Sequence, residues 1–161
     1  MQKRYNKYFT YQEFTCQCGC GKRNMRKPFI IQLTEARKLV EPYGIVFDIA
    51  EGSGCRCVKH NSAVGGSVLS RHIAGGAVDI PVANDWERGL IVKALYAVGF
   101  TSVGVAKGYI HVDDRKQDAC WYYERDTDAT VEKLRKTEAK VKSLLMEIGE
   151  LKDKIREEDV Y

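Results

Sequence analysis

The sequence predicts an α+β fold for most of the chain, with a separate helix at the C-terminal end. Three observations support this prediction. Two segments carry apolar residues at helical spacing, several short β-rich runs are bounded by Gly or Pro, and the composition changes after residue 123. The chain has 161 residues, 44% of them hydrophobic, which suits one core of ordinary size. We therefore expect a small antiparallel sheet with flanking helices in residues 1–123 and an amphipathic helix in 124–161.

The first half of the chain alternates irregular and regular segments. Residues 8–27 are cysteine-rich and irregular, and Pro28 then opens a helix that ends before Gly44. Residues 45–50 form a short β-rich run, and residues 52–76 are rich in Gly, Ser, Asn and Cys, which predicts a long, site-bearing loop. The helix has an apolar stripe of Phe29, Ile30, Leu33, Ala36, Leu39 and Val40.

The second half supplies most of the predicted sheet. Residues 77–82 have the composition of a strand, and a helix follows from residue 84 to a C-terminal glycine at residue 99. Residues 101–107 and 109–113 then form two strands joined by a tight turn at Gly108. These elements complete the predicted antiparallel sheet.

Residues 124–161 differ from the rest in charge and in period. Residues 1–123 carry 17 Lys and Arg against 11 Asp and Glu, a net of +6, whereas 124–161 carry 9 against 11, a net of −2. A heptad pattern predicts either a coiled coil that makes a homo-oligomer through residues 134–155 or a helix that folds back on its own domain. Its core positions are Leu134, Thr137, Val141, Leu144, Ile148, Leu151 and Ile155.

Composition and charge argue against several classes of protein. No run approaches the roughly 18 apolar residues of a membrane span. The basic N-terminus leads into no apolar segment, so we expect cytoplasmic synthesis without a signal peptide. The basic residues are scattered and match no nucleic-acid-binding motif, so we expect no nucleic-acid partner.

Two of the three histidines lie in patterns that favour metal binding. His72 stands seven residues before Asp79, with Gly75 and Gly76 between them to let the two side chains converge. Strand periodicity places Tyr109, His111 and Asp113 on one face. Two His and one Asp, with water at the fourth position, constitute a catalytic zinc site. The spacing alone leaves open that these are hydrogen-bonded core histidines.

The combined motifs resemble those of one enzyme family. Ser-x-His-x-x-Gly-x-Ala-x-Asp at 70–79, followed by His-x-Asp at 111–113, is similar to the zinc D-Ala-D-Ala carboxypeptidase / L-Ala-D-Glu endopeptidase family. The resemblance covers about residues 8–115 and is greatest to a small, phage-associated branch. It implies hydrolysis of peptidoglycan stem peptides and a fold shared with the N-terminal domain of Hedgehog. Further matches are Phe14-Thr-Cys16, Ser53-Gly-Cys-Arg56-Cys57 and the segment from His60 to Gly66.

The resemblance also implies roles for individual residues. His72, Asp79 and His111 would bind one catalytic Zn²⁺ ion. Arg56 would stabilise the oxyanion or bind a substrate carboxylate, and Ser70 would hydrogen-bond the substrate. The residues themselves leave simpler roles open, namely a loop-pinning arginine paired with an acid and a local turn hydroxyl.

The general base departs from the family pattern. Many relatives carry Glu or Asp about three residues before the last His, where this chain has Gly108. Asp113 is the substitute we predict, either as the base or as a partner that fixes a ligand imidazole. Tyr109 could supply a hydroxyl to the transition state, and His60 is expected to brace its loop rather than bind metal.

These features favour a zinc-dependent peptidase of peptidoglycan, an endolysin or a wall hydrolase of phage or prophage origin. It would act at the bacterial cell wall after release or within a phage particle. The alternative is a non-catalytic zinc-binding module, similar to Hedgehog, that assembles through its C-terminal helix. The absence of an acid at position 108 favours this second hypothesis.

The six cysteines require a separate interpretation. Synthesis in a reducing compartment disfavours disulfides, and Cys-x-Cys-x-Cys is not the usual spacing of a zinc ribbon. A strand over this segment would also alternate the sulfurs. Ordinary, partly buried thiols are the favoured interpretation, and the alternative is a structural metal or clasp that joins residues 16–20 to Cys57.

Overall fold

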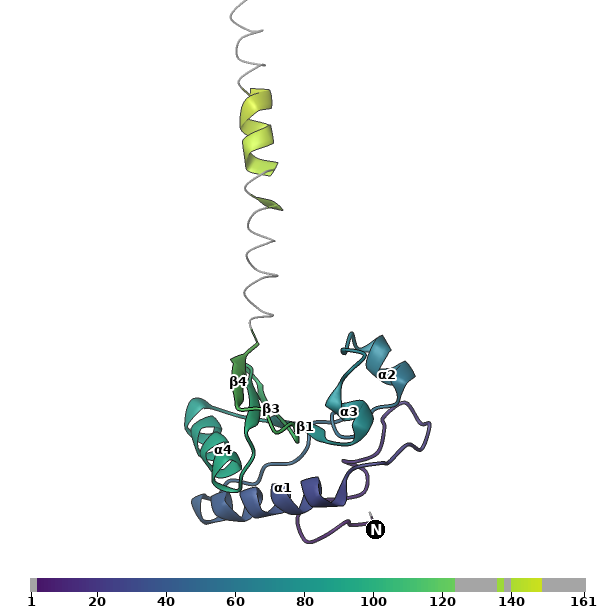
Figure 1. Cartoon of the computed structure of the whole chain (residues 1–161). Helices are drawn as coiled ribbons and strands as arrows, with labels where there is room; N and C mark the ends of the chain where they lie inside the picture. The colour runs from purple at the N-terminus through teal and green to yellow at the C-terminus, as the bar shows by residue number, and fades with distance from the viewer. Residues whose placement is uncertain (1–2, 124–135, 138–139, 149–161) are drawn as a thin grey trace, which may run out of the picture. The chain divides into compact units, whose positions relative to one another are not determined.

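The computed structural model describes residues 3–123, 136–137 and 140–148. The chain divides into two compact units, Met1–Tyr123 and Glu124–Tyr161, which are described separately (Figure 1). Within the described residues, no helix is both long enough and apolar enough to cross a membrane.

The first unit is built on a four-stranded sheet, and the predicted α+β class is confirmed. The strands are β1 (Ala77–Pro81), β2 (Ser102–Val105), β3 (Tyr109–Asp113) and β4 (Ala119–Tyr122), in the spatial order β1-β3-β2-β4. β3 pairs antiparallel with both β1 and β2, as the sequence predicts. β4 was not predicted, and it pairs parallel with β2, so the sheet is mixed rather than antiparallel. β4 lies at the edge and buries little surface, which leaves only a weak hydrophobic pattern in the sequence.

Two long helices, α1 (Lys27–Val40) and α4 (Asp85–Ala97), cover one face of the sheet. Pro28 occupies the first turn of α1, where its missing N–H breaks no hydrogen bond. α1 continues into a short 3₁₀ helix, η1 (Glu41–Tyr43), and Gly44 ends it in the left-handed conformation. At the start of α4 the Asn84 side chain accepts a hydrogen bond from the Glu87 backbone N–H at 2.9 Å.

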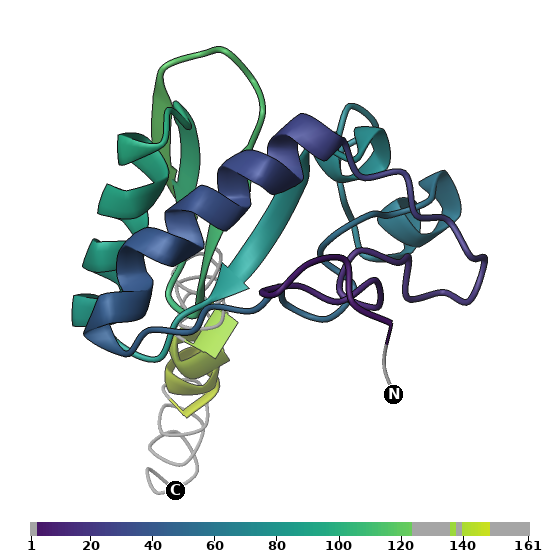
Figure 2. The same ribbon diagram turned by 90° about the horizontal axis from the view of Figure 1, so that it is seen from below.

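The core lies between this helical layer and the sheet. Figures 1 and 2 show α1 and α4 side by side, and α4 also contacts β3. Alternate strand residues face the helices, which leaves the intervening residues for the opposite face. The buried sheet residues of the core are Val78, Ile80, Val103, Ile110 and Val112. The opposite face is therefore the one that presents Asp79, His111 and Asp113.

Residues 45–50 form no strand, contrary to the prediction. Their alternating pattern is nevertheless real, since Ile45, Phe47 and Ile49 are buried in the core and Val46 is exposed. The period of two in the sequence thus arises from alternate burial of an extended segment. This segment contacts the backbone of β1 through a hydrogen bond from the Ala50 N–H to the Asp79 carbonyl oxygen at 2.9 Å.

The predicted long loop at 52–76 contains two short helices, α2 (Val58–Ala63) and α3 (Arg71–Ala74). α2 has six residues and α3 has four, and they bury few apolar side chains, which explains why hydrophobic periodicity did not reveal them. α3 contacts β1, and α2 contacts α3 (Figure 1). The loop is thereby folded against the edge of the sheet that carries Asp79.

The described part of the second unit is helical. Its residues 136–137 and 140–148 include Val141, Leu144 and Ile148, three of the predicted heptad positions, all about half exposed in the single chain. Leu134, Leu151 and Ile155 lie outside the described residues, so the heptad prediction over 134–155 stays a prediction.

Candidate metal centre

Three side chains far apart in the sequence converge on one point. His111 Nδ1 lies 2.8 Å from Asp79 Oδ1, and His72 Nε2 lies 3.5 Å from the same oxygen. One donor atom from each residue lies within 4.8 Å of the other two. The structure therefore brings together the three residues that the sequence analysis selected as metal ligands.

Strand register and a short helix create this convergence. β1 and β3 pair so that Asp79 lies directly opposite His111. His72 belongs to α3, which is capped by Ser70 at its start and by Gly75, with a φ of 71°, at its end. Only glycine adopts this left-handed conformation at little cost, and a side chain here would also collide with the backbone of Asn24. The predicted role of Gly75 in turning the chain back toward Asp79 is thus confirmed.

Each of the three side chains is held through its other polar atom. His72 Nδ1 lies 3.1 Å from the carbonyl oxygen of Gly54, which only accepts, so Nδ1 carries the proton and Nε2 presents a lone pair to the cluster. His111 Nε2 lies 3.1 Å from Asp113 Oδ2. The second oxygen of Asp79 accepts a hydrogen bond from the Arg56 guanidinium at 3.0 Å. Such outer contacts orient the ligands of metal sites in proteins.

These contacts also provide a test of whether a cation fits. Asp113 accepts a hydrogen bond from the Nε2–H group of His111. If the imidazole is neutral with its proton on Nε2, the lone pair of Nδ1 points at an Asp79 oxygen only 2.8 Å away. Two lone pairs at this distance repel, and a proton or a metal ion between them removes the repulsion. The donor set of two imidazoles and one carboxylate is one that Zn²⁺ accepts.

The electrostatics of the metal-free cluster agree with this arrangement. Burial alone would raise the pKa of Asp79, but its contacts with His111 and His72 hold it well below its usual range. Burial would lower the pKa of His111, and hydrogen bonds to Asp113 and Asp79 raise it above 6.5 instead. In the absence of metal, the two carboxylates therefore favour the protonated form of His111.

Asp113 occupies a position that favours one of its two predicted roles. Its side chain is completely buried, and Arg115 Nε lies 2.9 Å and 3.0 Å from its two oxygens. Burial opposes ionisation, but the contacts with His111 and Arg115 hold the pKa of Asp113 well below its usual range. Asp113 contacts the ring nitrogen of His111 that faces away from Asp79. This geometry favours the partner that fixes an imidazole over the general base.

Arg56 and Ser70 take up the simpler roles that the sequence left open for them. Arg56 donates to the carbonyl of Gly52 and to Asp79, so it pins the loop and pairs with an acid. The Ser70 hydroxyl accepts from the His72 backbone N–H at 3.3 Å and so caps α3. The predicted contacts of both side chains with substrate stay predictions.

Aromatic side chains form one wall of the site, and the sequence analysis missed most of them. The ring of His111 lies 5.6 Å from that of Trp121 and 6.4 Å from that of Tyr123, between ring centroids. Tyr109, which was predicted, lies 5.7 Å from Tyr123. Trp121 lies in β4 and Tyr123 directly follows its last residue. This pair of aromatic residues at i and i+2 was the signal in the sequence that could have indicated a strand with one aromatic face.

His60 lies outside this cluster, as expected. Its Nδ1 is 3.3 Å from the sulfur of Cys16, in a contact between α2 and the cysteine-rich N-terminal segment. The predicted role in bracing its loop agrees with this contact.

The fold and the site define a small α+β domain with a candidate metal centre of the catalytic type. A family model described as Peptidase M15 matches residues 7–113, and the chain belongs to the peptidase M15 family. The resemblance to zinc D-Ala-D-Ala carboxypeptidase-like peptidoglycan peptidases is thereby confirmed. No curated protein matches the chain.

The raised pKa of His111 predicts how pH changes the stability of metal-free protein. Protonated His111 stabilises the fold fully below its unfolded pKa of about 6.5. This contribution is lost as the pH rises through the higher folded pKa. NMR titration of the imidazoles should give a His111 pKa above 6.5, and the free energy of unfolding should fall over the same pH range.

Asp113→Asn should lower the pKa of His111 because it removes one of the two carboxylates that hold the proton. Asp118→Asn, which changes an exposed carboxylate, should leave it unchanged. A His111 pKa at or below 6.5 in the metal-free wild type would contradict the described contacts.

Proposed function

We propose that the protein is a zinc-dependent peptidase that hydrolyses peptide bonds in peptidoglycan. One observation carries the proposal: His72, Asp79 and His111 each direct one donor atom to a common point while a second partner holds the other atom. Side chains that served only to pack the core would not need one polar atom at a common point and the other held by a separate partner. Membership of the peptidase M15 family supports both the reaction and the substrate class.

Zinc is the ion that these residues suit best. Two nitrogens and one oxygen make three protein ligands, which is the number that catalytic zinc sites use while leaving a position for water. When bound there, zinc supplies an activated water, with a pKa of about 7, and polarises the scissile carbonyl. The protein supplies the orientation of the ligands through Gly54, Asp113 and Arg56.

The remaining residues would bind and orient the peptide. Arg56 orients Asp79, and through its other guanidinium donors it would contact the oxyanion or a substrate carboxylate. Tyr109, Trp121 and Tyr123 give an aromatic wall beside His111 that would exclude water from the scissile bond and pack against the substrate. Ser70 would hydrogen-bond the substrate at the start of α3.

The biological setting that fits this activity is lysis or remodelling of a bacterial wall. We infer an endolysin or virion-associated hydrolase of phage or prophage origin that reaches the wall after release or from within a particle. The net charge of +6 on residues 1–123 would favour association with an anionic wall, in a manner that weakens with salt. Either D-Ala-D-Ala carboxypeptidase or L-Ala-D-Glu endopeptidase specificity is compatible with the site.

A second function is a non-catalytic zinc module that acts through its C-terminal helix. Two observations favour it. Gly108 stands where many relatives have an acid, and Asp113 is engaged by both His111 and Arg115. Such a protein would bind zinc at the same site without turning over peptides.

Digestion of purified peptidoglycan separates these two functions. Zinc-loaded wild type should release new peptide termini, which mass spectrometry of the soluble fragments identifies along with the bond cut. His72→Ala should abolish the release, because a site with two ligands holds zinc poorly. Lys59→Ala, which changes an exposed side chain of α2, should retain activity. Zinc-loaded protein that cleaves no wall chemotype would support the second function instead.

Asp113→Asn distinguishes positioning of His111 from general-base catalysis. Loss of an outer hydrogen-bond partner costs about 10–100-fold in metal affinity or activity. If Asp113 positions the imidazole, higher zinc concentration should restore most of kcat. Removal of a general base would instead lower kcat by about 100–10,000-fold at every zinc concentration. A persistent defect at saturating zinc would therefore assign Asp113 as the base.

For the second unit we propose self-association through residues 134–155. The described apolar side chains Val141, Leu144 and Ile148 are about half exposed in the single chain, which supports burial against another copy. Sedimentation equilibrium should give an oligomer for the full chain and a monomer for residues 1–123. Monomers from both would exclude the coiled coil.

A further inference from the structure

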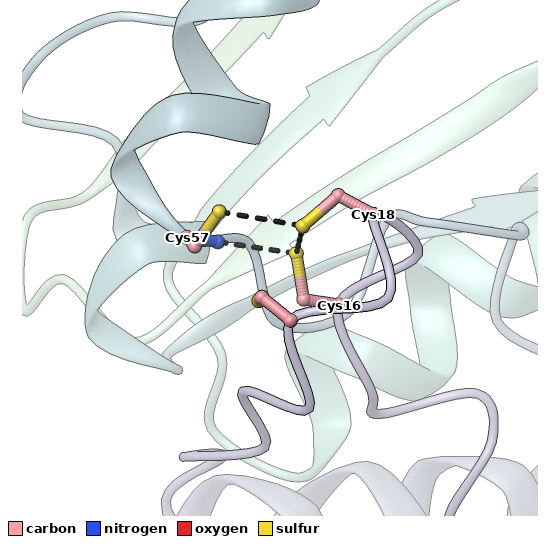
Figure 3. A group of neighbouring side chains, drawn as sticks. Cys16, Cys18 and Cys57 are labelled. Carbon is pink, nitrogen blue, oxygen red and sulfur yellow. Dashed lines mark hydrogen bonds between the residues drawn. The ribbon is translucent and has the colours of Figure 1, made fainter.

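Four of the six cysteines gather at a second point in the first unit. Cys16, Cys18 and Cys20 come from the N-terminal segment, and Cys57 comes from the start of α2. We call these four residues the cysteine cluster. The sulfur of Cys18 lies 3.4 Å from that of Cys16 and 3.5 Å from that of Cys57 (Figure 3). All four sulfurs, that of Cys20 included, lie within 4.8 Å of one another.

The local backbone allows this gathering in a way that the sequence analysis did not anticipate. Residues 17–20 form turns and bends rather than a strand, so the sulfurs of Cys16 and Cys18 do not alternate between two faces. The predicted alternation of these sulfurs is therefore wrong. The turn directs both sulfurs toward Cys57, as Figure 3 shows.

The sulfurs also accept hydrogen bonds from the backbone. The N–H of Cys57 donates to the sulfur of Cys16 at 3.3 Å, and the N–H of His60 donates to the sulfur of Cys57 at 3.3 Å. The second contact caps the N-terminus of α2. N–H donors that point at sulfur stabilise thiolate over thiol, and thiolate is the form that binds metals.

The distances between the sulfurs fit a shared ion. Sulfurs bound at about 2.3 Å to one tetrahedral zinc ion are separated by about 3.8 Å. A disulfide bond would require about 2.05 Å between two sulfurs, whereas those of Cys16 and Cys18 lie 3.4 Å apart. A group of four thiolates without a cation would place like charges side by side.

We propose that Cys16, Cys18, Cys20 and Cys57 bind a structural zinc ion, separate from the site at His72, Asp79 and His111. Four thiolate ligands leave no position for water, which is the mark of a structural rather than a catalytic site. The proposal does not depend on the proposed peptidase activity.

The position of the cluster gives this ion a role in the fold. Cys57 follows Arg56, which pairs with Asp79, and lies three residues after Gly54, whose carbonyl holds His72. A side chain at Gly54 would collide with the backbone of Glu13, so the N-terminal segment and this loop pack directly together. An ion at the cluster would clasp the two segments and so fix two of the three outer contacts of the candidate metal centre.

Metal analysis of the full chain, purified from zinc-supplemented cells under reducing conditions, tests the proposal. Elemental analysis should find two zinc ions per chain in the wild type and one in the double variant His72→Ala/His111→Ala. It should find one in Cys18→Ser/Cys57→Ser. Cys120→Ser, which changes an exposed cysteine of β4 outside the cluster, should retain two.

X-ray absorption spectroscopy of His72→Ala/His111→Ala tests the ligands without altering any cysteine. The remaining zinc should have four sulfur neighbours at about 2.3 Å. The proposal would be overturned if His72→Ala/His111→Ala bound no zinc, or if its zinc had no sulfur neighbours. Disulfides within the cysteine cluster of the zinc-replete protein would also overturn it. These outcomes are independent of peptidoglycan cleavage, so failure of the peptidase proposal can be distinguished from failure of this one.

Discussion

The carboxylate of Asp79 lies between two imidazoles and a guanidinium, and only 15% of its side chain is exposed. A charge in such surroundings is costly unless it is paired and hydrogen-bonded, so the neighbours of Asp79 cannot vary freely. The register of β1 and β3 meets part of this requirement by placing His111 opposite Asp79. The chain must then bring His72 and Arg56 to the same carboxylate, and the fold of residues 52–76 achieves this.

The loop before α2 is therefore the support of the site. Gly54 holds one imidazole and Arg56 holds the carboxylate, so two of the three outer contacts come from three consecutive residues. The third contact, from Asp113, comes from the sheet and is itself fixed by Arg115. Residues 52–57 contain no helix or strand of their own, which gives a physical reason for a clasp at the end of this loop.

Particular elements show what limits prediction from the sequence. α1 and α4 were predicted because each buries one stripe against the sheet and ends at a Gly or Pro signature. The segment 45–50 was misassigned because alternate burial and backbone pairing give the same pattern. β4 was missed because an edge strand buries little, and with it Trp121 and Tyr123 were lost from the predicted site.

The sequence by itself determined the α+β class, the identity of the three candidate ligands and the likeness to the M15 peptidases. These follow from local patterns, because periodicity and motif spacing are properties of neighbouring residues. Only the tertiary structure decided which nitrogen of each imidazole faces Asp79, that Asp113 and Arg56 orient ligands, and that four cysteines meet. Those facts depend on contacts between segments as many as 41 residues apart, and no local pattern encodes the direction of a side chain across such a distance.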